Sequence, residues 1–99
     1  MTFEEFKSSL VQSSVADLPP ALRALREDAR GNWDAAHTIA QDIDDNMGAW
    51  IHAYLHRKEG DSANAGYWYR RAGQPPARDS LEEEWARIVR AALSEFFIA

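Results

Sequence analysis

The sequence has no cysteine, which excludes disulfide bonds and thiol catalysis and is typical of a protein from a reducing compartment. It has no run approaching the roughly 20 apolar residues of a membrane-spanning helix. Its first residues, Met-Thr-Phe-Glu-Glu-Phe-Lys, lack the cationic and apolar regions of a secretory signal. Strand patterns are also missing, because β-branched residues are isolated and no run alternates apolar with polar. We therefore expect an all-α, cytoplasmic protein that does not enter a membrane.

The composition fits one globular domain spanning residues 1–99, because 45% of the residues are hydrophobic. Four Trp, three Tyr and four Phe supply the large side chains for its core. The net charge of −5 is unevenly distributed. Residues 51–78 carry 5 Lys/Arg against 2 Asp/Glu, whereas residues 1–50 carry 4 against 9 and residues 79–99 carry 2 against 5. A basic middle therefore lies between acidic ends, and the chain as a whole is too acidic to favour nucleic-acid binding.

Residues that start or end helices are frequent along the chain. Thr2 with Glu5, and Ser80 with Glu83, have the spacing of capping boxes, which begin helices. Turn signals made of Gly, Pro, Asn and Asp divide the chain between these two points. The pattern predicts six helices, at residues 3–14, 20–30, 33–43, 47–59, 62–73 and 81–97. The first and last show an apolar stripe at helical spacing and should pack inward along it.

Two segments of the chain resemble each other. GNWDAAHTIAQDI from Gly31 aligns without a gap to GDSANAGYWYRRA from Gly60, at an offset of 29 residues. The same offset pairs Ala24 with Ala53 in the preceding helices, and small residues there allow two helices to approach closely. Such self-similarity is typical of stacked helical hairpins. We expect hairpins at about 20–43 and 48–73, closed into a compact bundle by the amphipathic helices at both ends.

The second hairpin resembles a tetratricopeptide repeat unit. In AYLHRKEGDSANAGYWYRRAGQPP, a turn Gly, two Ala, an aromatic and a Pro occupy the positions of that pattern: Gly60, Ala65, Tyr69, Ala72 and Pro76. The first-helix pattern departs from the family at His52 and His56, and the period is shorter than the family's. WIHAYLHRKEGD with NAGYWYRRAG is also similar to a group of small uncharacterised microbial proteins. The resemblance implies a helical scaffold that binds a peptide or another protein, and it implies no catalytic residue.

The histidines are the first candidate functional residues. His52, His56 and Glu59 share one strip of the helix at 47–59, and His37 lies on the preceding helix. Two histidines four residues apart can ligate one metal ion, with His37 as a third ligand. The alternatives are a polar helix face, histidines paired across the hairpin, or, for His37, a core position. The neighbouring Arg57 and Lys58 count against a bound cation, so the sequence by itself assigns no cofactor, metal or catalytic residue.

The second candidate is the segment Tyr67-Trp68-Tyr69-Arg70-Arg71. Three successive aromatics span too wide an arc to enter one core, so we expect Tyr67 to be partly exposed beside Arg70 and Arg71. Aromatic and arginine side chains are typical anchors of recognition surfaces. Alternatively, Tyr67 packs on the last helix and the arginines pair with Glu82 to Glu84.

The function that the sequence favours is a non-catalytic binding module for an acidic peptide or a small anionic ligand. Its candidate surface comprises His37, His52, His56, Arg57, Tyr67, Arg70 and Arg71. The alternative is an enzyme or metal-binding protein that uses His52, His56 and Glu59 with His37. A third hypothesis is a homodimer formed through the C-terminal helix, because consecutive apolar residues at 96–99 point in different directions.

Overall fold

The computed structural model describes residues 1–15 and 17–97, and within them it contains six α-helices and no strand. The helices are α1 (Phe3–Ser9), α2 (Pro20–Ala29), α3 (Trp33–Gln41), α4 (Asn46–Lys58), α5 (Ser62–Ala72) and α6 (Leu81–Phe96). The predicted all-α fold is confirmed. Across the described ranges, no helix is both long and apolar enough to cross a membrane.

The helix starts follow from their caps. Thr2 and Ser80 form the two predicted capping boxes, in which the hydroxyl accepts from a backbone N–H three residues on. Asp45 and Asp61 accept in the same way from Gly48 N and Asn64 N, which starts α4 and α5. Gly73 ends α5 in the left-handed conformation that glycine adopts without strain.

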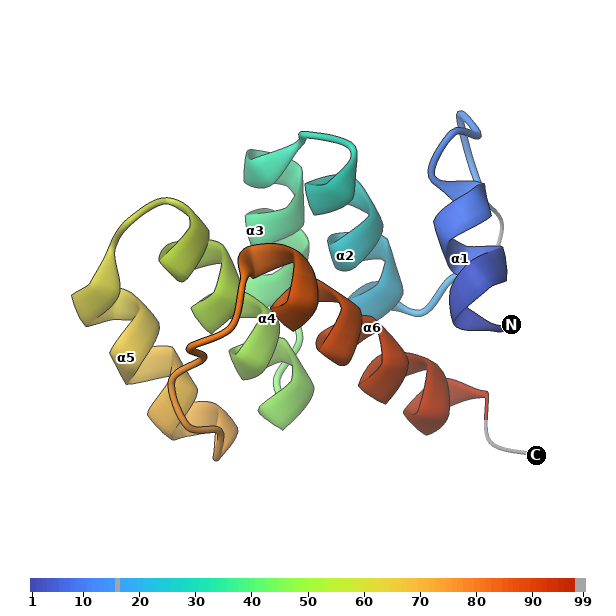
Figure 1. Ribbon diagram of the computed structural model, residues 1–99. Coiled ribbons are helices and arrows are strands. Elements are labelled where there is room, and N and C mark those ends of the chain that lie inside the picture. The colour runs from blue at the N-terminus through green and yellow to red at the C-terminus, as the bar shows by residue number, and fades with distance from the viewer. Residues whose placement is uncertain (16, 98–99) are drawn as a thin grey trace.

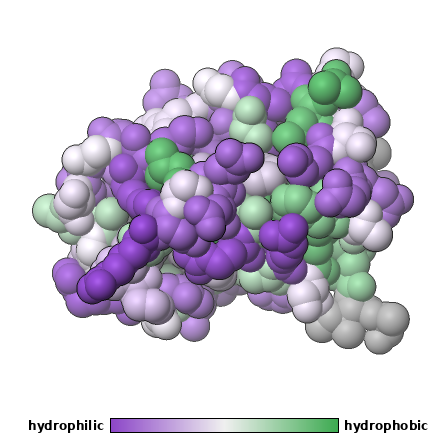
Figure 2. All heavy atoms as spheres, viewed as in Figure 1, coloured by the Kyte–Doolittle hydropathy of each residue, from purple (hydrophilic) through white to green (hydrophobic). Residues whose placement is uncertain are grey.

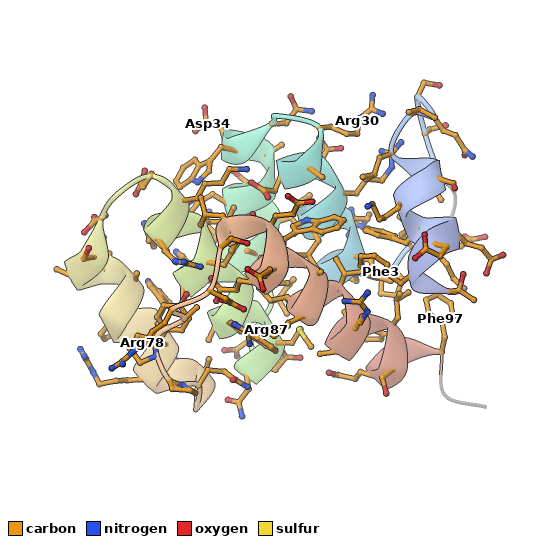
Figure 3. The ribbon with its side chains drawn as sticks, in the orientation of Figure 1. Phe3, Arg30, Asp34, Arg78, Arg87 and Phe97 are labelled. Atoms are coloured by element: carbon orange, nitrogen blue, oxygen red, sulfur yellow. The ribbon has the colours of Figure 1, made fainter. Side chains whose placement is uncertain are left out.

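The predicted end of the first helix is wrong: α1 ends at Ser9, not at residue 14. The reason is a set of contacts from α2 to the end of α1 and the residues that follow it. Arg26, on α2, donates to the carbonyl oxygens of Ser9 and Gln12. Arg30 donates to those of Leu10, at 2.5 Å, and of Gln12, at 2.6 Å. These contacts satisfy the carbonyl groups that a longer helix would have used. Figure 3 shows Arg30 at the end of α2, near the loop that follows α1.

Helix α4 is the centre of the fold. It contacts α2, α3, α5 and α6, and every residue from Met47 to His56 is buried. Figure 1 shows α6 crossing over α4 and α2, with α5 at one end of the molecule and α1 at the other. The fully buried large side chains of the core come from α1, α2, α4 and α6: Phe6, Leu22, Leu25, Ile51, Leu55, Ile88, Glu84 and Val89.

The hairpins α2–α3 and α4–α5 are alike at the positions that the sequence offset pairs. Gly31 and Gly60 both have φ of +88° in the hairpin turn, a backbone conformation that favours glycine. Ala24 and Ala53 are both fully buried, so each first helix meets its neighbours at a small residue. Each pair of helices is in extensive contact. The turn glycine and the buried alanine therefore have the same structural role in both hairpins.

One buried carboxylate ties α6 to α4 and α5. Glu84 is fully buried and accepts from the Tyr69 hydroxyl at 2.9 and 2.7 Å, from Trp50 Nε1 at 3.2 Å and from Arg57 Nη1 at 2.8 Å. Arg57 also donates to the backbone oxygen of Asp79. Burial and the Glu84 carboxylate raise the pKa of the Tyr69 hydroxyl, which therefore stays a donor. This network fixes one face of α4 and leaves the histidine face to α3 and α5.

Most of the exposed large apolar residues lie near the chain ends, and Tyr67 on α5 is the exception among the described residues. Figure 2 shows a mostly hydrophilic face with hydrophobic residues clustered over α1 and the second half of α6. Phe96 and Phe97 are 41% and 43% exposed. Phe3 and Phe97 lie on the adjoining sides of α1 and α6 (Figure 3). The rest of the predicted dimer segment, Ile98 and Ala99, lies outside the described residues.

Candidate metal centre

All three histidines of the chain come together on one side of α4. The ring centroids are 4.6 Å apart for His37 and His52, 5.3 Å for His37 and His56, and 4.8 Å for His52 and His56. One ring nitrogen from each lies within 4.8 Å of those of the other two. His52 and His56 are buried, with exposed fractions of 6% and 8%, and His37 is half-buried. Residues 15 and 19 positions apart in the sequence thus form one cluster.

The spacing of the residues along α4 and the packing of α3 against it explain why the three histidines lie close together. His52 and His56 are four residues apart, so their rings lie over each other on α4, at an interplanar angle of 23°. Helix α3 packs against α4 and presents His37 to the same strip. The ring of His37 stands nearly at right angles to that of His52, at 89°. One ring edge therefore faces the two stacked rings.

Two tryptophans flank the histidines. Trp33 stacks on His37 with centroids 4.9 Å apart, and its Nε1–H donates to the carbonyl oxygen of Leu55 at 2.9 Å. Trp68 stacks on His52 at 3.9 Å. From the sequence, the tryptophans are counted as core side chains, and Trp33 is not identified as part of a site. The spacing of Trp33 and His37, four residues apart on one helix, is the signal that could have joined them.

The surroundings keep two of the imidazoles, those of His52 and His37, in their neutral form. Burial, together with the nearby His37 and His56, lowers the pKa of His52 to about 4. Burial and His56 also lower the pKa of His37. Near neutral pH, both rings therefore have a nitrogen lone pair free to accept a hydrogen bond or to bind a metal ion.

Glu59 orients the third imidazole. Its Oε1 lies 2.7 Å from Nδ1 of His56, so Nδ1–H donates to the carboxylate and Nε2 is the ring nitrogen left for a metal ion. Glu59 also gathers with His56 and Asp61 into a second group whose ligand atoms lie within 4.8 Å of one another. Glu59 is not part of the three-histidine group. Its carboxylate contacts His56 from outside that group and so can orient the ring without binding the metal ion itself.

The basic residues next to the histidines point elsewhere. Arg57 is bound to Glu84, and Lys58 Nζ lies 2.9 Å from Asp28 Oδ1, a carboxylate that is itself buried. The expectation that Arg57 and Lys58 would repel a cation is therefore corrected: their charges are paired on the far side of α4. Arg57, predicted as part of the binding surface, is not near the histidine cluster.

The remaining predicted residues lie on α5. Tyr67 is 44% exposed, which confirms the prediction, and it accepts from Arg71 Nη1 at 3.2 Å. The Arg71 guanidinium lies over the Trp68 ring, 5.3 Å from its centroid, and so adjoins the cluster. Arg70 is exposed and does not line the cavity that reaches His52. Within residues 1–15 and 17–97, neither arginine forms a salt bridge, so the alternative pairing with Glu82 to Glu84 is wrong.

A cavity of about 220 Å³ reaches the cluster at His52. Its wall includes Trp68, Arg71 and the turn between α3 and α4. A larger cavity of about 630 Å³ lies between α2 and α3, beside Val15 and Leu18, and contains none of the predicted site residues. The smaller cavity is therefore the one that concerns the candidate site.

Comparison with known proteins finds no matching family model, curated protein or solved structure. Three clustered imidazoles, a carboxylate behind one of them and two flanking tryptophans make a set of nitrogen donors suited to a transition-metal ion.

Proposed function

We propose that this domain binds one divalent transition-metal ion through His37, His52 and His56. The observation that carries the proposal is that every histidine in the chain contributes a ring nitrogen to one cluster within 4.8 Å. Imidazole nitrogen is a preferred ligand of Zn²⁺, Co²⁺, Ni²⁺ and Cu²⁺, whereas Mg²⁺ and Ca²⁺ take oxygen ligands. The function supported best is therefore binding of a zinc-like ion.

The distances are compatible with coordination after a small adjustment. A Zn–N distance of about 2.05 Å and tetrahedral angles place ligand nitrogens about 3.3 Å apart. Nitrogens up to 4.8 Å apart reach that spacing if each ring moves inward by about 1 Å or less. Such movements lie within side-chain rotation. The interaction of His56 with Glu59 is the usual outer-shell arrangement, in which a carboxylate fixes the tautomer and raises ligand basicity.

The charged side chains around the cluster also favour a bound cation. The carboxylates of Glu59 and Asp34 lie close enough to His37 to favour positive charge there, because both raise its pKa against the effect of burial. The nearest cations along the chain, Arg57 and Lys58, are neutralised by buried acids. The field at the cluster is therefore more favourable to a metal ion than the sequence suggests.

The test is a calorimetric titration of the full chain, purified without a histidine tag and stripped with a chelator. We expect one equivalent of Zn²⁺ to bind to the native chain. His37→Gln, His52→Gln and His56→Gln should each weaken binding at least tenfold, because a three-ligand site becomes a two-ligand site. Thr38→Gln, beside His37 on an exposed face of α3, is the matched control and should bind as the native chain does. Less than about a tenth of an equivalent, or equal affinity in the histidine variants, would refute the proposal.

A second candidate function, docking of an acidic peptide or a small anionic ligand on α5, is favoured by its arginines. Arg70 and Arg71 are exposed beside Tyr67, whereas Arg57 is committed to Glu84. The equivalence of the two hairpins supports a tetratricopeptide-like scaffold for such binding. Fluorescence anisotropy with a labelled oligoglutamate peptide tests it: Arg70→Ala with Arg71→Ala should abolish binding, and unchanged binding would reject the surface.

Two further features belong to the proposal. A cytoplasmic location fits a chain without cysteine. Self-association through the C-terminal helix is supported by the exposure of Phe96 and Phe97. Light scattering tests the second point: a dimer that becomes monomeric in Phe96→Ser is expected, and a native chain that stays monomeric at high concentration would contradict it.

A further inference from the structure

The three-histidine centre has too few protein ligands to complete the coordination of the ion proposed above. Ions of the zinc type take at least four ligands. Among the described residues, the group that meets at His52 contains three histidines and no carboxylate, because Glu59 and Asp61 group with His56 alone. The inference drawn from this rests on the proposed metal binding. One coordination position is left for a ligand from outside the chain.

Charge determines the class of that ligand. The three imidazole ligands carry no negative charge, so within its own coordination shell the ion keeps its double charge, in a site flanked by the indole rings of Trp33 and Trp68. The Glu59 carboxylate lies outside that shell, behind His56. A buried charge without a counter-charge is costly, and the surrounding rings supply no negative ligand. An anion in the open position removes part of that charge and is favoured over a neutral ligand.

The cavity beside His52 is the route by which such an anion reaches the centre. Its ionic lining consists of Asp44, Asp45 and Arg71, which give a net charge of −1 when no metal is bound. A divalent ion at His52 changes this sum to +1. Arg71, whose guanidinium lies over Trp68, is the cationic group in the cavity wall that can contact the incoming anion. Anion binding should therefore require the metal.

We propose that the metal ion held by His37, His52 and His56 takes a small singly charged anion, such as a carboxylate, as its fourth ligand through the cavity lined by Arg71. The volume of about 220 Å³ corresponds to about seven water molecules of roughly 30 Å³ each and admits a small anion, not a folded peptide. Binding of a small anion at this centre is therefore distinct from the docking of a peptide on the outer face of α5.

The experiment uses the full chain loaded with one equivalent of Co²⁺, whose visible absorption reports its coordination, and azide as the probe. We expect a saturable change in the cobalt spectrum on titration with azide, and no azide binding to the metal-free chain by calorimetry. Arg71→Gln should weaken azide binding about tenfold, as expected for one hydrogen bond to a charged group. Arg70→Gln changes the net charge equally but lies outside the cavity lining, so it should leave the azide affinity unchanged.

The outcomes separate this inference from the proposed function. If cobalt binds at one equivalent to the histidines but azide leaves the spectrum unchanged, the anion proposal is wrong and metal binding stands. If Arg71→Gln and Arg70→Gln bind azide equally, the cavity is not the route. A chain that binds no cobalt contradicts the metal site itself.

Discussion

Replacing His52 by glutamine should flatten the dependence of stability on pH in the metal-free protein. In the native fold, burial beside His37 and His56 lowers the pKa of His52 to about 4, whereas an unfolded chain has a value near 6.5. The unfolded chain therefore binds a proton more readily than the folded one. The contribution of His52 to the free energy of unfolding is therefore fully present above about pH 6.5 and decreases as the pH falls toward 4.

The magnitude follows from the difference between the two pKa values. One pKa unit is worth about 1.4 kcal/mol, so a difference of about 2.5 corresponds to about 3 kcal/mol between pH 7 and pH 4. That is a large share of the roughly 5–15 kcal/mol that stabilises a domain of this size. His37, whose pKa is also lowered, changes stability in the same direction.

Urea unfolding followed by circular dichroism, with a chelator present, measures this effect at intervals from pH 4 to pH 8. Carboxylates that titrate at low pH act equally in both proteins, so the informative quantity is the difference between native chain and His52→Gln. That difference should change by about 3 kcal/mol between pH 7 and pH 4 and stay constant above pH 7. Parallel curves throughout the range would refute the account of His52 as a buried neutral imidazole.

Substitutions at four other residues test separate parts of the structure. Glu59→Ala should weaken Zn²⁺ binding about 10–100-fold in the calorimetric titration, whereas Glu59→Gln, which keeps an acceptor oxygen, should recover part of the loss; equal affinities would exclude an outer-shell role. Gly48→Ala should lower the free energy of unfolding by about 1–3 kcal/mol, because a Cβ there would collide with the backbone oxygen of Ile43. Gly66→Ala, whose Cβ meets nothing nearer than 3.6 Å, should raise it by up to about 1 kcal/mol, and urea unfolding that gives both variants the same sign would contradict the packing described. Tyr69→Phe removes the hydroxyl that donates to buried Glu84 and should cost about 1–3 kcal/mol; a cost near zero in the same assay would show that the carboxylate does not depend on it.

Local signals in the sequence predict most of the fold. Caps such as Ser80 with Glu83 act within one turn of helix, so helix starts can be located without knowing what the helices pack against. The end of α1 could not be located in this way, because Arg26 and Arg30 bind its last carbonyl groups from another helix. Contacts between distant segments, not propensity, decide that boundary.

The site is predictable only in part for the same reason. The spacing of His52 and His56 places both rings on one strip of any helix. The approach of His37 depends on how α3 packs against α4, which the sequence pattern does not specify. The position of Arg57 depends on Glu84, a buried partner from α6, and the sequence does not specify which basic residue pairs with that carboxylate.

The central claim is that the histidines form one metal centre, and X-ray absorption at the zinc edge of the protein loaded with one equivalent tests it most directly. The account predicts three imidazole nitrogens at about 2.0–2.1 Å and one further light-atom ligand from outside the chain. In His37→Gln the imidazole count should fall from three to two. A zinc ion coordinated by oxygen ligands, with one imidazole or none, would contradict the account.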